Sequence, residues 1–218
     1  MFVKICGMTN EEDALLAVAM GADAVGFVFA PSVRQVAPTL ARDIARRLPP
    51  EILTIGVFRD EAPKRVLEIT ELAGLRGVQL HGREPPEQAR WLRQRTRFVM
   101  QGFPAADPAV AKAKDYGVDA VLLDNPTPGS GRVFDWALAS EVPSGVRLVI
   151  AGGLTPDNVG DAVSAVQPWG VDVATGVERE PGRKDPVKLR TFIAAARGAE
   201  RAPYEGSDDM PYDWQEDL

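Results

Sequence analysis

The feature that most constrains the fold is a repeat of short apolar runs that alternate with segments of helical period along most of the 218 residues. The runs recur about every 20–28 residues, roughly the length that one strand and its crossover helix require. They are continuous rather than alternating, which is typical of parallel strands covered on both faces. The expected strands are Phe2–Cys6, Ala24–Phe29, Ile52–Phe58, Gly77–Leu80, Arg97–Gly102, Ala120–Asp124, Arg147–Ala151 and Val171–Thr175.

Helical segments lie between these runs, and several open on a capping residue or a proline. The expected helices are Asn10–Met20, Thr39–Leu48, Glu61–Ala73, Glu84–Arg95, Asp107–Tyr116, the shorter Phe134–Ser140, Thr155–Val166 and Asp185–Arg197. Eight strands, each followed by a crossover, predict a single-domain α/β fold, a closed (β/α)8 TIM barrel. An open, doubly wound sheet is the alternative that this pattern leaves.

The charge distribution separates the end of the chain from the rest. From Gly198 to Leu218 there are seven acidic residues and one basic residue, so this segment carries the whole formal charge of −6. We therefore expect a catalytic barrel domain over residues 1–197 and a solvated acidic tail over residues 198–218. Neither part has the basic surplus of a nucleic-acid-binding surface, so no nucleic-acid partner is expected.

One cysteine and one histidine limit the metal and redox chemistry. The single Cys6 excludes an intramolecular disulfide and fits a reducing compartment. Together with the single His81 it argues against a protein-built zinc site, and we expect no metal. No apolar run reaches the ~20 residues of a membrane helix, and the N-terminus does not resemble a signal peptide. A cytoplasmic protein without a membrane partner is the expectation.

In a barrel of this kind the active site forms where the strands end, so the residues at those positions are the candidates. Cys6 ends the first strand and is followed by a glycine. Its thiolate could act as a general base, and its alternative role is that of a small buried apolar side chain. Lys4 faces the same way by the alternation of the strand, either as a neighbour of the thiol or in a structural ion pair.

Arg34 and His81 also lie over the expected mouth. Arg34 follows the second strand, and its guanidinium could hold a carboxylate or phosphate in fork geometry or simply face solvent. His81 ends the fourth strand and could contact substrate or be a hydrogen-bonded structural residue. We expect it to face the substrate.

Asp124 ends the sixth apolar run, where a carboxyl is costly to bury unless it is paired or protonated. Burial would suit it to act as a general acid, because desolvation raises the pKa of a carboxyl. A loop-bracing or N-capping role is the alternative. The loop after it contains Gly129-Ser130-Gly131, which could let a ligand approach closely.

Glycines follow the seventh and eighth strands, at Gly152-Gly153 and Gly176. Many barrels bind phosphate at this place through backbone N–H groups. Asp172, within the eighth strand, could reach the mouth. It also belongs to a repeated Gly-X-Asp triplet whose other members, Asp23 and Asp119, precede strands, so a structural role stays open.

Six motifs in register resemble the phosphoribosylanthranilate isomerase family of tryptophan biosynthesis, from Val3 to about Ala196. They are Lys-Ile-Cys-Gly-Met-Thr (4–9), Gly-Ala-Asp-Ala-Val-Gly-Phe-Val-Phe (21–29), Val-Gln-Leu-His-Gly (78–82), Gly-Ser-Gly followed by Phe-Asp-Trp (129–136), Ala-Gly-Gly-Leu-Thr-Pro-Asp-Asn-Val (151–159), and Gly-Val-Glu with Pro-Gly-Arg-Lys-Asp (176–185). The resemblance implies an Amadori rearrangement of N-(5-phosphoribosyl)anthranilate to 1-(2-carboxyphenylamino)-1-deoxyribulose 5-phosphate, without a cofactor.

The resemblance also implies a role for each candidate. Cys6 would be the general base and Asp124 the general acid. Arg34 would hold the anthranilate carboxylate, and Asp172 would line the anthranilate side of the pocket. The phosphate would lie on the loops at Gly152-Gly153 and Gly176-Val177. The enzyme would act as a monomer or a homodimer.

Two other kinds of function stay possible on the sequence. One is a different phosphosugar isomerase or epimerase barrel, although a paired-aspartate isomerase would carry an acid where this chain has Cys6. The other is a non-catalytic phosphate-binding barrel. That interpretation requires a broken acid–base pair, whereas both Cys6 and Asp124 are present.

Overall fold

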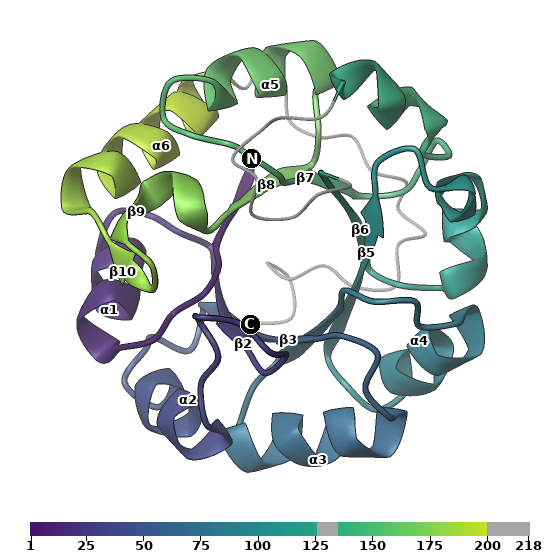
Figure 1. The fold of residues 1–218 in the computed structure, drawn as a ribbon, viewed down its shortest axis with the longest axis horizontal. Helices are drawn as coiled ribbons and strands as arrows, with labels where there is room; N and C mark the ends of the chain where they lie inside the picture. The colour runs from purple at the N-terminus through teal and green to yellow at the C-terminus, as the bar shows by residue number, and fades with distance from the viewer. Residues whose placement is uncertain (126–134, 200–218) are drawn as a thin grey trace.

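Eight parallel strands close into a barrel in the computed structural model, which describes residues 1–125 and 135–199. Each strand pairs with the next along the chain, and β1 pairs with β8 to complete the ring (Figure 1). The strands are β1 (Phe2–Ile5), β2 (Ala24–Val28), β3 (Leu53–Phe58), β4 (Gly77–Leu80), β5 (Phe98–Pro104), β6 (Ala120–Asp124), β7 (Leu148–Ile150) and β8 (Gly170–Val173). The predicted closed barrel is confirmed, and the open sheet is not what forms.

Helices cover the outside of the ring. They are α1 (Glu11–Ala19), α2 (Pro38–Ala45), α3 (Pro63–Ala73), α4 (Pro86–Arg93), α5 (Val159–Val166) and α6 (Pro186–Gly198), with 3-10 helices η1 (Pro108–Tyr116), η2 (Trp136–Glu141) and η3 (Thr175–Val177). Four of the six α-helices have a proline in the first turn, as fits a residue without an N–H group. Of these four, only α6 also has a side-chain cap, Asp185, which accepts from the N–H groups of Val187 and Lys188.

Several of the expected elements differ in detail, and the short helix expected over Phe134–Ser140 is the 3-10 helix η2 (Trp136–Glu141). The segment expected as the helix Asp107–Tyr116 is a 3-10 helix with a kink at Lys112. The helix expected to begin at Thr155 begins at Val159 instead, after a turn in which Thr155 N–H donates to the side chain of Asn158. The eighth strand ends at Val173 rather than Thr175, because Ala174 leaves the extended conformation and a 3-10 turn follows.

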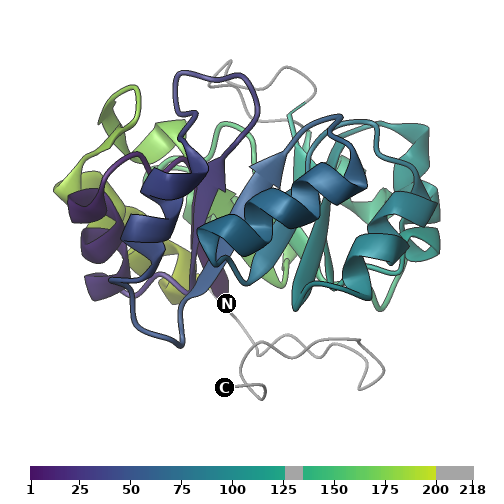
Figure 2. The same cartoon turned by 90° about the horizontal axis from the view of Figure 1, so that it is seen from below.

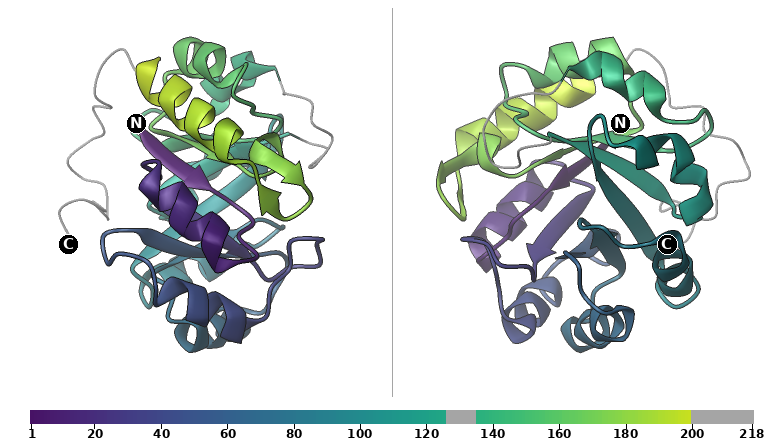
Figure 3. Two further views of the ribbon diagram at one scale, coloured as in Figure 1. Left: turned by 90° about the vertical axis from the view of Figure 1, so that its left-hand side faces the viewer. Right: turned by 45° about the vertical axis from the view of Figure 1, so that its right-hand side comes forward.

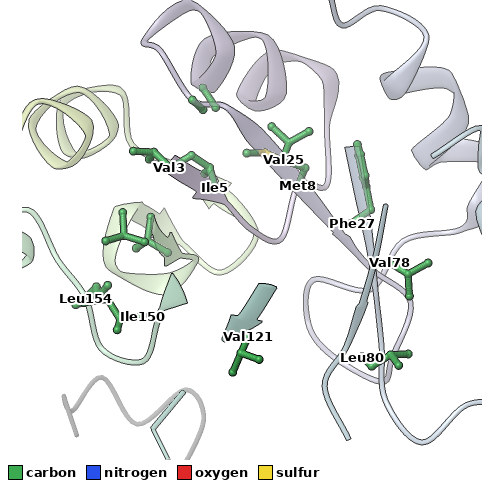
Figure 4. Packing of buried hydrophobic residues seen from close by; sticks show 14 of the residues in the cluster. Val3, Ile5, Met8, Val25, Phe27, Val78, Leu80, Val121, Ile150 and Leu154 are labelled. Carbon is green, nitrogen blue, oxygen red and sulfur yellow. The ribbon is translucent and has the colours of Figure 1, made fainter. Parts of the chain in front are cut away.

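Side chains alternate between the inside of the barrel and the helix layer. Along β1, Val3 and Ile5 belong to the large cluster that joins strands to helices, whereas Phe2 belongs to a second cluster with other interior residues. Figure 4 shows Val3 and Ile5 among the apolar residues of the strands and the neighbouring loops. By this alternation Lys4 and Cys6 point into the barrel, on the same side as Phe2.

The connections after β2 and β8 rise at the end of the barrel opposite to the N-terminus (Figure 2). The second of them contains a hairpin that the sequence analysis did not predict, made of β9 (Glu178–Glu180) and β10 (Arg183–Lys184). The hairpin lies beside α1 and leads into α6 (Figure 3). It is attached to α1 by the N–H of Lys184, which donates to Asp13.

Two segments named from the sequence lie outside the described residues: the loop Gly129-Ser130-Gly131 and the acidic tail beyond Ala199. Within residues 1–125 and 135–199, no helix is both long enough and apolar enough to span a membrane.

Candidate active site

Cys6 follows β1 directly, and its thiol lies beside the ion pair that joins β1 to β8. Lys4 and Asp172 are partners in the strand register, with 2.9 Å between Lys4 Nζ and Asp172 Oδ1. Gly26 on β2 leaves room for these groups, because a Cβ added there would lie 2.8 Å from Cys6 Sγ and 3.2 Å from Lys4 Nζ. Gly26, the second glycine of the motif at residues 21–29, therefore keeps space for the thiol.

The surroundings of Cys6 act on its ionisation in opposite directions. Burial raises the pKa of the Cys6 thiol, and the nearby charge of Lys4 opposes that rise only in part. Burial alone would lower the pKa of Lys4, but Asp172 and Cys6 raise it above its ordinary value. Lys4 is therefore a cation next to the thiol, whereas burial favours the neutral form of the thiol.

Asp124 ends β6 and is held by two hydrogen bonds. Its Oδ1 accepts from the N–H of Asn125 at 2.7 Å, and its Oδ2 lies 3.1 Å from Nε2 of His81. The Nδ1 of His81 lies 2.8 Å from the side-chain nitrogen of Gln79. The structure thus brings His81 and Asp124 together, as their strand-end positions suggested.

A cavity of about 240 Å³ lies at the same end of the barrel. It is lined by the carboxyl side of β6 to β8 and the loops that follow: Asp124, Ala151, Gly152, Gly153, Leu154, Thr155, Asp172, Val173, Ala174, Thr175 and Gly176. Five of the candidates named from the sequence therefore share one cavity. Val177 does not line it, because its side chain is fully buried in the core.

The two glycine loops of the cavity require glycine for steric reasons. Gly152 has φ of +79°, and a Cβ there would lie 2.4 Å from the backbone nitrogen of Asn125. Gly153 has φ of +71°. A Cβ at Gly176 would lie 1.8 Å from the carbonyl oxygen of Leu154, so the loops after β7 and β8 are in direct backbone contact. Such backbone, free of side chains, lets an anion approach N–H groups closely.

Arg34 reaches over the mouth from the β2–α2 loop but is already engaged by an acidic residue. Its Nε donates to Glu178 Oε1 at 2.7 Å and its Nη2 to Glu178 Oε2 at 2.6 Å. Nη2 also donates to the hydroxyl of Thr175 at 3.2 Å. The stem of Arg34 lies on Gly7, where a Cβ would be 2.6 Å from Arg34 Cδ. Arg34 thus stands next to the end of β1 in a fixed orientation.

Glu178 and Lys184 were given no role from the sequence, although both lie in a motif of the resemblance. Lys184 is fully buried and its Nζ donates to the carbonyl oxygens of Cys6 at 2.6 Å and Ala174 at 3.1 Å, and to Glu178 Oε1 at 3.1 Å. It bridges the ends of β1 and β8 just beyond their last paired residues. The acid and the base in this motif were the only hint of a role that the sequence offered. Their contacts with the ends of β1 and β8 become visible only once the hairpin is in place.

Among the described residues there is no cluster of three or more histidine, cysteine, aspartate or glutamate side chains arranged to hold a metal ion. The candidate site thus consists of a thiol and a carboxyl at the ends of β1 and β6, an anchored guanidinium, and a glycine-lined cavity beside the carboxyl.

A family model described as N-(5'phosphoribosyl)anthranilate (PRA) isomerase matches residues 3–195. The chain belongs to the phosphoribosylanthranilate isomerase family. A relative named N-(5'-phosphoribosyl)anthranilate isomerase, from Desulforudis audaxviator, is 49% identical over 204 residues, which cover 90% of this chain and 98% of that protein. The matched region of the family thus contains every candidate site residue.

Solved structures of phosphoribosylanthranilate isomerases are similar to the chain as well. The crystal structure of the enzyme from Thermus thermophilus has a TM-score of 0.85 at 44% identity and covers 91% of this chain and 99% of its own. Another structure, a complex with reduced 1-(o-carboxyphenylamino)-1-deoxyribulose 5-phosphate, has a TM-score of 0.80 at 39% identity and the same coverage. Members of the phosphoribosylanthranilate isomerase family therefore share this barrel, and one of them binds a phosphorylated, carboxylated ligand.

Proposed function

We propose that this protein is a phosphoribosylanthranilate isomerase, which converts N-(5-phosphoribosyl)anthranilate to 1-(2-carboxyphenylamino)-1-deoxyribulose 5-phosphate in tryptophan biosynthesis. The observation that carries the proposal is the family match over residues 3–195 on a barrel whose mouth presents Cys6 and Asp124. The reaction is an internal redox change between C1 and C2 of the sugar. It needs an acid and a base, and the proposal includes no metal or organic cofactor.

In the first step Asp124 acts as general acid. It gives a proton to the ring oxygen of the furanose, the C1–O bond breaks, and a Schiff base forms between C1 and the anthranilate nitrogen. His81, at 3.1 Å from Asp124, orients the carboxyl that donates this proton. In the second step the thiolate of Cys6 removes the proton from C2, and the enolamine that results tautomerises to the ketone.

Binding of the substrate at both ends supplies the orientation that proton transfer requires. The phosphate is assigned to the loops at Gly152-Gly153 and Gly176-Val177, where the backbone can approach an anion. The carboxylate of the anthranilate is assigned to Arg34, and Asp172 lines the anthranilate side. Positioned acids and bases each contribute about 10²–10⁴-fold, so both kinds of contribution are needed.

The test is conversion of freshly generated phosphoribosylanthranilate, followed by the loss of its anthranilate-type fluorescence. The wild type should turn over, whereas Cys6→Ala and Asp124→Asn should each lose about 10²–10⁴-fold in kcat. Both variants should still bind the reduced product analogue. A folded wild type that binds phosphate without turnover would instead favour a non-catalytic barrel, or another phosphosugar as substrate.

The remaining expectations belong to the same proposal. The catalytic domain extends over residues 1–197 and the acidic tail over residues 198–218. The enzyme acts in the cytoplasm as a monomer or a homodimer, without a nucleic-acid partner. Sedimentation of the full chain distinguishes the two oligomeric states.

A further inference from the structure

Glu178 forms an ion pair with Arg34, the arginine to which the proposed function assigns the substrate carboxylate. Both oxygens of Glu178 accept from Arg34, in the fork geometry that a carboxylate and a guanidinium prefer. The two residues are 144 positions apart in the chain and come from the loops after β2 and β8. The two hydrogen bonds use Nε and Nη2 of Arg34. Within the described residues, Nη1 of Arg34 donates no hydrogen bond that would compete with a ligand.

Two roles for Glu178 are compatible with this contact. It could hold Arg34 permanently, so that substrate binds through Nη1. Alternatively it could stand in for the substrate carboxylate and leave when substrate arrives. The surroundings of Glu178 favour the first, because its side chain is only 3% exposed and has a second cationic partner.

That partner is Lys184, whose Nζ lies 3.1 Å from Glu178 Oε1 and whose side chain is fully buried. Burial alone would raise the pKa of Glu178, but its hydrogen bonds with Arg34 and Lys184 lower it below its ordinary value. If Glu178 swung away, a buried cation would lose its only carboxylate among the described residues. Leaving a buried charge unpaired is strongly unfavourable, so the pair resists displacement.

The neighbours of Arg34 also fix its position. Its stem lies against Gly7, its Nη2 donates to both Thr175 and Glu178, and its Nε donates to Glu178 as well. A long, flexible side chain is thus restricted at its stem and along one edge of its guanidinium before any ligand binds. Pre-organisation of this kind lowers the entropy that binding would otherwise cost.

We infer that Glu178, held in place by Lys184, is a positioning residue that sets the specificity of the enzyme for a carboxylate on the aromatic ring of its substrate. It acts through Arg34 and does not touch the reacting atoms. The inference rests on the proposed function. It predicts that loss of Glu178 lowers kcat/KM for substrates that have the ring carboxylate and leaves kcat/KM nearly unchanged for substrates that lack it.

The experiment compares two substrates, N-(5-phosphoribosyl)anthranilate and N-(5-phosphoribosyl)aniline, which lacks the carboxylate. In Glu178→Gln, kcat/KM for the first should fall about ten- to a hundredfold, chiefly through KM, because misplacement of a binding group by about 1 Å costs up to about 10²-fold. For the aniline substrate it should change less than about threefold, so the preference for the carboxylate falls by the same factor. Glu180→Gln is the matched control, since Glu180 is an exposed residue of the same strand and loses the same charge.

Binding of the reduced product analogue provides a second readout that does not depend on turnover. Its Kd should rise about ten- to a hundredfold in Glu178→Gln, whereas inhibition by inorganic phosphate should be unchanged. If Glu178→Gln does not fold, Glu178→Asp keeps the charge for Lys184 but is too short to reach both cations, and it should show the same loss of preference.

Three results would overturn the inference. Equal losses for both substrates would make Glu178 a general structural residue. Tighter binding of the carboxylated analogue by Glu178→Gln would make Glu178 a displaceable stand-in. If the wild type converts neither substrate, the proposed function itself fails, and the inference fails with it.

Discussion

Lys4 and Asp172 face each other where the first and last strands of the barrel meet, with 2.9 Å between Lys4 Nζ and Asp172 Oδ1. Lys4 is fully buried, and the side chain of Asp172 is 9% exposed. The pair lies between the apolar interior layer that contains Phe2 and the cavity at the mouth. It therefore separates the apolar interior of the barrel from the cavity at its mouth.

We expect the two partners of this pair to be strongly coupled in stability. Lys4→Met leaves Asp172 as an unpaired buried carboxylate and should lower the free energy of unfolding by about 3–5 kcal/mol. The double variant Lys4→Met/Asp172→Leu removes both charges and should recover most of that loss. Urea denaturation of the wild type, both single variants and the double variant measures the coupling. Losses that simply add would show that the pair is not a unit.

The pH dependence of the rate should follow from the burial of Cys6. Burial raises the pKa of the Cys6 thiol, and only the thiolate can accept a proton. We therefore expect kcat/KM to rise with pH from neutral into the alkaline range, until the thiol is ionised. Because Cys6 is the only cysteine, the difference in ultraviolet absorbance between the wild type and Cys6→Ala, in which the contribution of the tyrosines cancels, reports the titration of the thiol. If the residual activity of Cys6→Ala still rises with pH in the same range, the rise belongs to a group other than Cys6.

A methyl group at Gly176 should disturb the proposed phosphate site. Gly176 does not have a positive φ, so Gly176→Ala acts through the contact of its Cβ with the carbonyl oxygen of Leu154 rather than through backbone strain. We expect inhibition by inorganic phosphate to weaken at least about tenfold, with about 1–3 kcal/mol lost from the free energy of unfolding. Titration with phosphate and urea denaturation measure the two effects.

Gly160→Ala is the matched control for that substitution. Gly160 lies in α5, and the nearest atom to its added Cβ is the Cβ of Ala199 at 4.0 Å. The variant should be about 0.4–1 kcal/mol more stable than the wild type, because the unfolded chain loses conformational freedom. Its affinity for phosphate should be unchanged. Weaker phosphate binding in both variants would exclude a specific role for Gly176.

Stability at low pH should report the network around Glu178. The folded protein holds the pKa of Glu178 below its ordinary value of 4.5. A lowered pKa gives stability that is present above pH 4.5 and is lost as the pH falls below that value and through the lowered pKa. The difference in free energy of unfolding between the wild type and Glu178→Gln should therefore be largest near neutral pH and shrink below pH 4.5. Glu180→Gln should differ little from the wild type throughout.

The order of the strands was predictable because each strand of a parallel barrel needs an apolar run and a crossover of its own. The local conformation of the crossovers was less so. The segment from Asp107 to Tyr116 has the composition of a helix, yet it forms a kinked 3-10 helix. The hairpin β9–β10 consists of charged residues and short strands, so no apolar period indicated it.

The repeated Gly-X-Asp triplet shows why the register could not be predicted. Asp23 and Asp119 precede β2 and β6, and each accepts from the N–H of a residue twenty positions earlier, Val3 and Val99. In the third copy the strand begins at the glycine itself, so Asp172 lies inside β8 and pairs with Lys4. Local sequence is alike in all three, and only the pairing of β8 with β1 separates an aspartate that caps a strand from one that lines the cavity.

The same limit applied to the side chains around Cys6 and Arg34. Their positions at strand ends were predictable, because active sites of barrels form there. The partners that hold them were not, because Glu178 and Lys184 reach them from a segment more than 140 residues later in the chain. Contacts over such distances depend on the closed ring, which a local pattern does not specify.

Closure of the ring also sets when the site can exist during synthesis. Cys6 leaves the ribosome long before Asp172 and Lys184, which hold the end of its strand. Until the last strand and the hairpin have emerged, the nascent chain has a thiol without its neighbouring ion pair and an arginine without its acidic partner. The protein therefore gains its chemistry in one late step, and a chain that stops before residue 184 should be inert however much of its barrel has formed.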